Sequence, residues 1–293
     1  MILTVTLNAA LDITYTVPSL VPGTTHRVQE VSERAGGKGI NVARVLHQLS
    51  LPVLATGFAG GLPLGDLPHS FVPLSASSRR TVTVVDDGGA TLLNEPGPAV
   101  SSAEWQRFVD HFRLLAREAT VVVLSGSLPP GVPVDAYTQL VSTVDCLTVV
   151  DTSGVALSHA VSARPDVVKP NADELREVTG HRSPQAGAAA LMHDGARAVV
   201  ASLGPEGLLA MTGTESWQLA PPGALAGNPT GAGDACVAGI AAGLHAGATW
   251  PAILREAVAL SAAAVLHPVA GGYDPDAYEQ LRAKLPDARK ALR

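Results

Sequence analysis

The sequence predicts an α/β fold in which helices cover a mostly parallel β-sheet and a small second sheet forms a lid. Short β-type runs alternate with helical patterns along most of the 293 residues, as in βαβ units. Residues 12–33 and 79–95 have instead the pattern of antiparallel hairpins. The chain has no linker, low-complexity tract or internal repeat, so we expect a single domain over residues 1–293 that includes these lid segments.

The apolar runs predict six buried strands: Ile2 to Leu7, Val53 to Thr56, Thr120 to Leu124, Leu147 to Val150, Asp166 to Val168 and Ala198 to Ser202. Helices are expected at residues 39–49, 102–117, 133–143, 171–178 and 184–193, and the chain is mainly helical after residue 233. In the second lid segment, Asp86-Asp87-Gly88-Gly89 is interpreted as a hairpin turn rather than a metal site.

Composition excludes several classes of function. The net charge of -6 argues against a nucleic-acid-binding protein, which normally has a basic face. Only two cysteines occur, without metal-ligand spacing, which fits a reducing compartment. No signal-peptide pattern is present, and no apolar stretch approaches the roughly 18 residues of a membrane span. We therefore expect a cytoplasmic protein with no membrane segment.

The segment Asn228-Pro229-Thr230-Gly231-Ala232-Gly233-Asp234 carries the strongest chemical signal, because an apolar helical run follows it. Glycines let the backbone approach a ligand closely, and a helix start offers free amide groups to an anion. Asp234 adds a carboxylate that can accept a proton. A base beside an anion hole is what phosphoryl transfer requires. The simpler alternative is that Asp234 only caps the helix.

A second glycine-rich segment, Gly36-Gly37-Lys38-Gly39-Ile40-Asn41, differs from a Walker A loop because Gly39 stands where Ser or Thr would bind magnesium. Lys38 and Asn41 are expected on adjacent turns of one helix, facing one pocket. Their ammonium and amide groups suit a phosphate and a sugar hydroxyl. The alternative is a helix-start loop with a solvated lysine.

Three further segments follow predicted strands. In Lys169-Pro170-Asn171-Ala172-Asp173-Glu174, the spacing of Asn171 and Glu174 fits a capping box. It also allows Glu174 to organise Mg²⁺ through water, with Lys169 reaching a nucleotide phosphate. The turn around Ser202 and Gly204 can approach a nucleotide, and Ser127 can meet a substrate at the carboxyl edge of the sheet. Ser127 does not lie in a G-x-S-x-G motif, so a serine hydrolase is not supported.

Taken in order, these segments resemble the ribokinase-like (PfkB) carbohydrate kinase superfamily, and most closely its 1-phosphofructokinase and tagatose-6-phosphate kinase group. The resemblance spans nearly the whole chain. It is carried by Thr4 to Asp12, Gly36 to Asn41, Asn94 to Pro98, Leu124 to Pro130, Val150 to Gly154, Lys169 to Glu174, Ser202 to Gly204 and Asn228 to Asp234.

The resemblance implies a three-layer α/β/α sandwich with a β lid, and a role for each matching position. Asp234 would be the catalytic base and Gly231, Ala232 and Gly233 the anion hole. The sugar phosphate would be bound by Asp12, Gly36, Gly37, Lys38, Asn41, Arg79 and Ser127. ATP would be bound by Lys169, Asn171, Ser202, Gly204, Gly207 and Ser261, and Glu174 would position Mg²⁺. The resemblance also allows a monovalent cation (K⁺) at the carbonyls of Asn228 and Thr230, and a homodimer formed through the lid.

The chain departs from this family pattern between Leu62 and Ser78, where Pro63, Pro68 and Pro73 exclude an ordinary helix. This departure leaves Arg79 and Arg80 as alternative phosphate ligands. The leading hypothesis is phosphorylation of fructose 1-phosphate to fructose 1,6-bisphosphate. A tagatose-6-phosphate kinase, a 6-phosphofructokinase and a non-catalytic sugar-phosphate sensor remain as alternatives.

Overall fold

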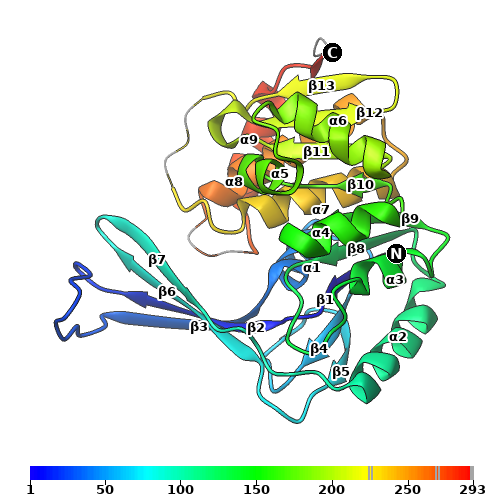
Figure 1. The fold of residues 1–293 in the computed structure, drawn as a ribbon. Coiled ribbons are helices and arrows are strands. Elements are labelled where there is room, and N and C mark those ends of the chain that lie inside the picture. The colour runs from blue at the N-terminus through cyan, green and yellow to red at the C-terminus, as the bar shows by residue number, and fades with distance from the viewer. Residues whose placement is uncertain (224, 226, 268, 270, 291–293) are drawn as a thin grey trace.

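The computed structural model describes residues 1–223, 225, 227–267, 269 and 271–290, and its strands form two sheets. The strands of the larger sheet, from edge to edge, are β14 (Arg289–Lys290), β13 (Ser216–Leu219), β12 (Leu208–Thr212), β11 (Ala198–Ser202), β10 (Val167–Val168), β9 (Leu147–Asp151), β8 (Val121–Ser125), β1 (Ile2–Thr6), β4 (Val53–Ala59) and β5 (His69–Pro73) (Figure 1). The strands from β11 to β5 are parallel, which confirms the predicted sheet.

Helices cover both faces of this sheet, so the predicted three-layer arrangement is confirmed. One face packs against α1 (Lys38–Gln48), α7 (Ala232–His245), α8 (Trp250–Val265) and α9 (Pro275–Lys284). The other packs against α2 (Ser102–Ala116), α3 (Ala136–Val141), α4 (Gly154–Ser162), α5 (Ala172–Thr179) and α6 (Pro184–Asp194). Within β8, Val121 and Val123 face the first group, and Val122 and Leu124 the second. This alternation arises because successive side chains of a strand point to opposite faces.

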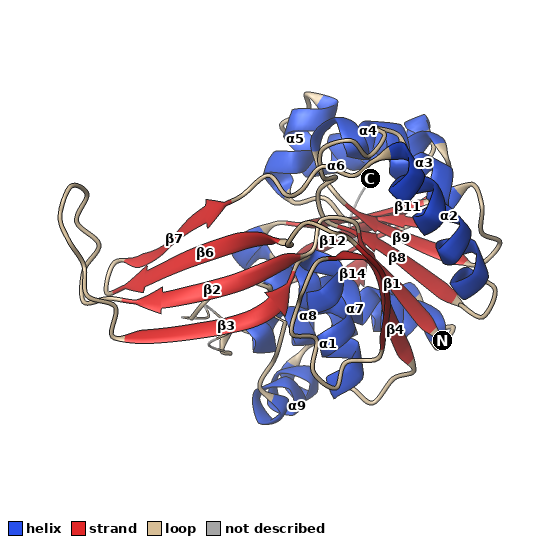
Figure 2. Cartoon of the chain, turned by 90° about the horizontal axis from the view of Figure 1, so that it is seen from below, coloured by secondary structure: helices blue, strands red, loops and turns tan. Residues whose placement is uncertain are grey.

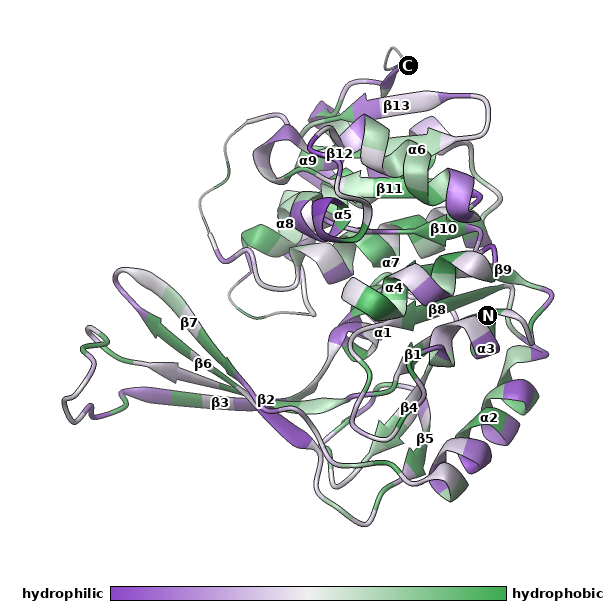
Figure 3. Ribbon diagram, in the orientation of Figure 1, coloured by the Kyte–Doolittle hydropathy of each residue, from purple (hydrophilic) through white to green (hydrophobic). Residues whose placement is uncertain are grey.

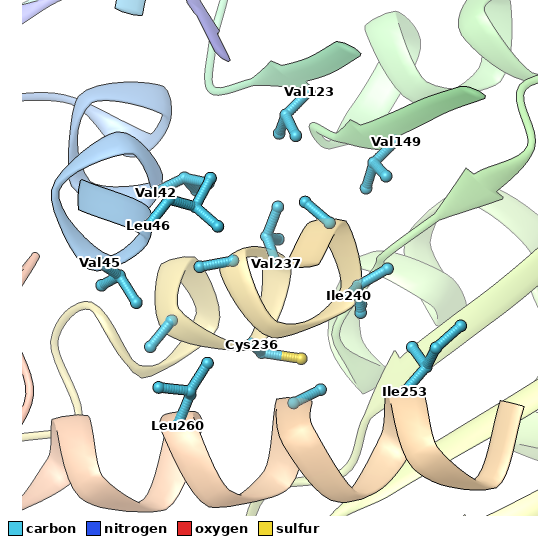
Figure 4. Close-up of a cluster of buried hydrophobic side chains, with 14 of the residues drawn as sticks. Val42, Val45, Leu46, Val123, Val149, Cys236, Val237, Ile240, Ile253 and Leu260 are labelled. Carbon is cyan, nitrogen blue, oxygen red and sulfur yellow. The ribbon is translucent and has the colours of Figure 1, made fainter. Parts of the chain in front are cut away.

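Helix α7 lies at the centre of the first helical layer. Cys236, Val237 and Ile240 pack among side chains of α1, α8 and the sheet (Figure 4). A Cβ atom at Gly239 would lie 2.6 Å from the Cα atom of Ala257, so glycine allows α7 and α8 to approach closely. Figure 3 shows α7 and the central strands as hydrophobic, in green, which explains their burial. This packing fixes the position of α7 relative to the sheet and to its neighbouring helices.

The second sheet forms the predicted lid. Its strand order is β3 (Glu30–Gly36), β2 (Ala10–Thr16), β6 (Arg79–Asp86) and β7 (Gly89–Asn94), and it projects from the main body (Figure 2). The pairs β2–β3 and β6–β7 are antiparallel, as predicted, and β2 runs parallel to β6. Oδ1 of Asp86 accepts a hydrogen bond from the amide of Gly88 at 2.8 Å, so this acidic cluster forms the expected turn.

Residues 60–68 connect the parallel strands β4 and β5 without a helix, as the prolines predicted. Leu62, Leu64 and Leu67 of this connection pack against the core and give the sheet the cover that a helix would supply. Helix α4, the parallel edge strand β5 and the antiparallel strands β12 to β14 were not predicted. Alanine, serine and valine are interspersed along α4, so its sequence has little amphipathic contrast. In the described part of the chain, every helix is too short or too polar to cross a lipid bilayer.

Candidate active site

The predicted chemical groups meet at the carboxyl edge of the main sheet. Strand β8 ends at Ser125, β9 ends at Asp151, and Lys169 follows β10. Ser202 ends β11, and a parallel bridge pairs it with Asn171. Because the carboxyl ends of parallel strands lie at one edge of a sheet, segments far apart in the sequence become neighbours. The first turns of α1 and α7 lie in the same region, since Asn41 of α1 is hydrogen-bonded to Asp234 of α7.

The start of α7 has the geometry of a partly free anion hole. Gly231 precedes the helix with a φ of 86°, which favours glycine, and no side chain caps the helix. The amide of Ala232 donates to the carbonyl of Pro229 at 3.2 Å. This bond narrows the predicted anion hole to the amides of Gly231 and Gly233. A Cβ atom at Gly233 would lie 3.8 Å from Nζ of Lys169, so an ammonium group stands beside these amides.

Asp234 lies in the first turn of α7 and is 7% exposed. Its Oδ2 atom accepts a hydrogen bond of 2.9 Å from Nδ2 of Asn41, so α1 holds the carboxylate of α7. Burial, and then the negative charge of Asp151, raise the pKa of Asp234 to about 7, although Lys38 and Asn41 act in the opposite direction. A buried carboxylate that titrates near neutral pH suits general-base catalysis. A capping role alone does not account for this environment, since the side chain is hydrogen-bonded to Asn41 of another helix.

Two lysines share one buried carboxylate next to Asp234. Nζ of Lys38 and Nζ of Lys169 each lie 3.3 Å from an oxygen of Asp151, which is itself 1% exposed at its side chain. Burial opposes ionisation of Asp151, but the two ammonium groups outweigh it and lower its pKa. The side chain of Lys169 is 4% exposed, whereas that of Lys38 is 39% exposed and can reach a ligand. Lys38 is therefore not a freely solvated lysine.

Asp151 was not predicted as a functional residue, although its segment contributes to the family resemblance. The available signal was its position immediately after a buried strand, at the edge where such folds bind ligands. Its hydrogen bond from Oγ of Ser125, at 3.2 Å, joins two neighbouring strands. What could not be seen along the sequence was that two distant lysines converge on it.

The capping box predicted at the start of α5 is present. Oδ1 of Asn171 accepts from the amide of Glu174, and Oε2 of Glu174 accepts from the amide of Asn171, each at 2.8 Å. Burial lowers the pKa of both Lys38 and Lys169, but the charge of Asp151 and smaller influences, Glu174 among them, together raise both pKa values. The described residues contain no group of three metal-ligating side chains. A Mg²⁺ ion that takes most of its ligands from nucleotide phosphates and water would fit this single carboxylate.

A largely apolar cavity of 540 Å³ begins at the anion hole. Of the residues predicted to bind ATP, it is lined by Asn171, Ser202, Gly204, Gly207 and Ser261. Ala232 and Gly233 line the same cavity, which connects it to the start of α7. Lys169, which was also predicted to bind ATP, is not among the lining residues and is paired with Asp151. Cys236, Val258 and Val265 also line the cavity and were missed by the sequence analysis, because apolar helix residues look like ordinary core.

The predicted sugar-binding groups lie where the lid joins the main sheet. The Asp12 carboxylate covers Gly36, since a Cβ atom there would lie 1.9 Å from its Oδ2 atom. Gly37 has a φ of 106°, and a Cβ atom there would contact Thr6 at 2.8 Å. Burial raises the pKa of Asp12, while the charge of Arg79 is the strongest influence that lowers it. The described geometry therefore brings Asp12, Gly36 and Arg79 together.

The side chains of Arg79 and Arg80 have different surroundings. Half-buried Arg79 donates from Nε to the carbonyl of Asn8 at 3.1 Å and lies near Asp12. Exposed Arg80 is bound to the carboxylate of Glu95 at 2.7 Å. Of the two arginines, Arg79 lies near Asp12, whereas Arg80 is held by Glu95. Ser127 accepts a 3.1 Å hydrogen bond from the side chain of Asn8, a further residue that the sequence analysis did not assign.

Comparison with known proteins agrees with this arrangement. The model of the pfkB family of carbohydrate kinases matches residues 4–276, which is nearly the entire chain. The chain belongs to this family. This pfkB kinase has the predicted ribokinase-like fold, and the resemblance found in its sequence is confirmed.

Individual relatives of this pfkB kinase act on different sugar phosphates according to their names. A tagatose-6-phosphate kinase of Staphylococcus epidermidis is 32% identical and covers 96% of this chain, which spans 97% of that protein. The phosphofructokinase-2 of Escherichia coli in complex with potassium is 30% identical, with a TM-score of 0.89 over 96% of this chain and 98% of its own. A possible 1-phosphofructokinase of Thermotoga maritima has a TM-score of 0.87 over 99% of both chains at 23% identity, a likeness of fold alone.

Proposed function

We propose that this pfkB kinase transfers the γ-phosphoryl group of ATP to the primary hydroxyl group of a ketohexose phosphate, with fructose 1-phosphate as the first substrate to test. The observation that carries the proposal is the Asp234 carboxylate at the glycine-rich start of α7, with a pKa of about 7. A sugar that already carries a phosphate is favoured by half-buried Arg79, because its guanidinium donates to backbone carbonyls rather than to a carboxylate and has further N–H groups for a phosphate.

In the proposed reaction, Asp234 accepts the proton of the attacking hydroxyl group. Asn41 keeps the carboxylate oriented, since its amide bonds to one oxygen and leaves the other for the substrate. The amides of Gly231 and Gly233, with Lys38 and Lys169, stabilise negative charge on the transferring group. These cations are already held in place by Asp151, so little reorganisation is needed during the reaction.

ATP would occupy the 540 Å³ cavity, with Asn171, Ser202, Gly204, Gly207 and Ser261 around it. Glu174 would hold Mg²⁺ through water, and the ion would neutralise phosphate charge. A K⁺ ion at the carbonyls of Asn228 and Thr230 is a further proposal, supported by the potassium complex of the Escherichia coli relative. The remaining assignments, Asp12, Gly36, Gly37 and Ser127 for the sugar phosphate, extend the same proposal. A reaction of this kind is consistent with a cytoplasmic protein.

Substrate choice is tested by an assay of ADP release with fructose 1-phosphate, tagatose 6-phosphate, fructose 6-phosphate, fructose and ribose. We expect the highest kcat/KM with one of the three phosphorylated sugars, and Arg79→Gln should lower that value by about tenfold or more. Arg80→Gln is the matched control, because Arg80 is paired with Glu95, and should change it little. Tagatose 6-phosphate is the second candidate, because a 32% identical relative is named for it. Turnover only with the neutral sugars would refute the sugar-phosphate assignment, and sugar-phosphate binding without any turnover would indicate a sensor.

The hydrogen bond from Asn41 predicts a shift in the pH dependence of kcat. Asp234 must be ionised to accept a proton, so kcat should fall as pH decreases through about 7. The bond favours the ionised carboxylate, so Asn41→Leu should raise the pKa of Asp234 and move this acidic limb to higher pH. The measurement is kcat between pH 5 and 9 at saturating substrate. An acidic limb that is unchanged in Asn41→Leu would contradict the proposed role of the bond.

The lid supports a proposed homodimer. Val31 and Leu93 lie on the same face of its strands, with exposed fractions of 54% and 59%. Such an apolar surface on a thin sheet is stabilised when a second protein covers it. Leu93→Glu should therefore shift the mass measured by light scattering from a dimer to a monomer. Leu114→Glu on α2 is the matched control, because Leu114 is also 59% exposed but lies outside the lid. A monomeric wild-type protein would refute the dimer.

A further inference from the structure

A cationic cavity lies between the last turns of α1, the base of lid strand β3 and the turn after α8. Its volume is 380 Å³, and its polar lining is Arg34, Arg44, His47, Gln48, Asp66 and His267. It shares no lining residue with the nucleotide cavity or with the cavity beside Arg79. Figure 2 shows β3 reaching the main body beside α1. The cavity is therefore separate from the pockets discussed so far.

Two arginines of different elements line this cavity, and their charges interact. Arg34 belongs to β3 and Arg44 to α1. Burial and then the charge of Arg34 lower the pKa of Arg44 to about 10, and burial also lowers the pKa of Arg34. The side chain of Arg44 is anchored by a hydrogen bond from its Nη1 atom to the carbonyl of Ala35. Two half-buried cations are thus held close together by the fold.

The neighbouring acids do not neutralise this pair fully. Among residues that the structure describes, neither Arg34 nor Arg44 forms an ion pair. Asp12, the cross-strand partner of Arg34, attracts both arginines, but its charge is shared with Arg79. The Asp66 side chain is 98% exposed, and its Oδ2 atom lies 3.9 Å from Nε2 of His47. Like charges in a half-buried site are unfavourable unless an anion joins them.

We propose that this cavity binds a small dianion of the phosphate monoester class, at a site distinct from that of the substrate's own phosphate. Paired guanidinium groups bind phosphate oxygens through several charge-assisted hydrogen bonds. His47 and Gln48, at the end of α1, supply further donors at the rim. The volume lies within the range of small-molecule sites. The inference does not depend on the proposed kinase substrate.

Inorganic phosphate is the probe, titrated into the full chain by calorimetry, with chloride at equal ionic strength as the reference. Because phosphate could also bind near Arg79, two arginine variants are compared. Arg34→Gln should weaken phosphate binding about tenfold or more, whereas Arg79→Gln should retain the wild-type affinity for this site. Unchanged binding in Arg34→Gln, or loss of all binding in Arg79→Gln, would overturn the proposal.

Thermal unfolding separates binding from folding. In phosphate-free buffer, Arg34→Gln should unfold at the wild-type temperature or above it, because the substitution removes a repulsive charge. Added phosphate should raise the unfolding temperature of the wild type and have a smaller effect on Arg34→Gln. A lower unfolding temperature of Arg34→Gln without phosphate would mean that Arg34 supports the fold, and the proposal would then be wrong.

Discussion

Asp234→Asn is expected to reduce kcat by about two to four orders of magnitude, the usual contribution of a general base. Asparagine has nearly the same shape and can keep a contact with Asn41, but it cannot accept the proton of the attacking hydroxyl group. The nucleotide cavity lacks this side chain among its lining residues, so the dissociation constant of ATP should remain close to that of the wild type. ADP release gives kcat, and calorimetry gives ATP binding.

The same variant should be more stable than the wild type at high pH. The pKa of Asp234 is about 7 in the folded protein and 3.8 in a model peptide, so the folded state resists losing this proton. Ionisation therefore reduces the free energy of unfolding progressively between pH 3.8 and 7, and the loss is complete above pH 7. Asp234→Asn has no carboxylate to ionise at this position, so its free energy of unfolding should not show this decrease. A stable variant with unaltered kcat would eliminate Asp234 as the base.

Asp151→Asn is expected to lower the free energy of unfolding by about 3 to 5 kcal/mol, as when one partner of a buried ion pair is removed. Lys169 is 4% exposed and would lose the only carboxylate to which it is paired in the described part of the chain. Lys38, which is more exposed, would become free to reorient. Urea denaturation measures the change. A loss below about 1 kcal/mol, the size typical of a surface pair, would show that the Asp151 charge is not needed.

Two further variants make the Asp151 experiment specific. Asp110→Asn removes an exposed carboxylate that pairs with Arg113, and should change stability little. The double variant Asp151→Asn with Lys169→Met should recover part of the lost stability, since it no longer leaves an unpaired ammonium group buried. Loss of the Asp151 charge should also lower the pKa of Asp234, so the acidic limb of kcat should move to lower pH.

The sequence alone was sufficient for features that depend on local pattern. Apolar runs marked the parallel strands other than β5, because a strand buried on both faces reads as continuous Val, Ile and Leu, whereas β5 is a partly exposed edge strand. Glycines at 231 and 233, followed by a helical run, marked the start of α7, and the prolines excluded a helix before β5. Each of these signals lies within one turn or one strand, so no knowledge of distant residues was needed.

Only the tertiary structure decided which groups contact each other. Asn41 and Asp234 are separated by 193 residues and Lys38 and Asp151 by 113, and no periodicity encodes such pairs. The different surroundings of adjacent Arg79 and Arg80 also required the fold, since neighbouring residues of a strand point to opposite faces. The sequence by itself determined the chemical groups at the edge of the sheet. Packing then determined their distances and burial, and with them the pKa values on which proton transfer depends.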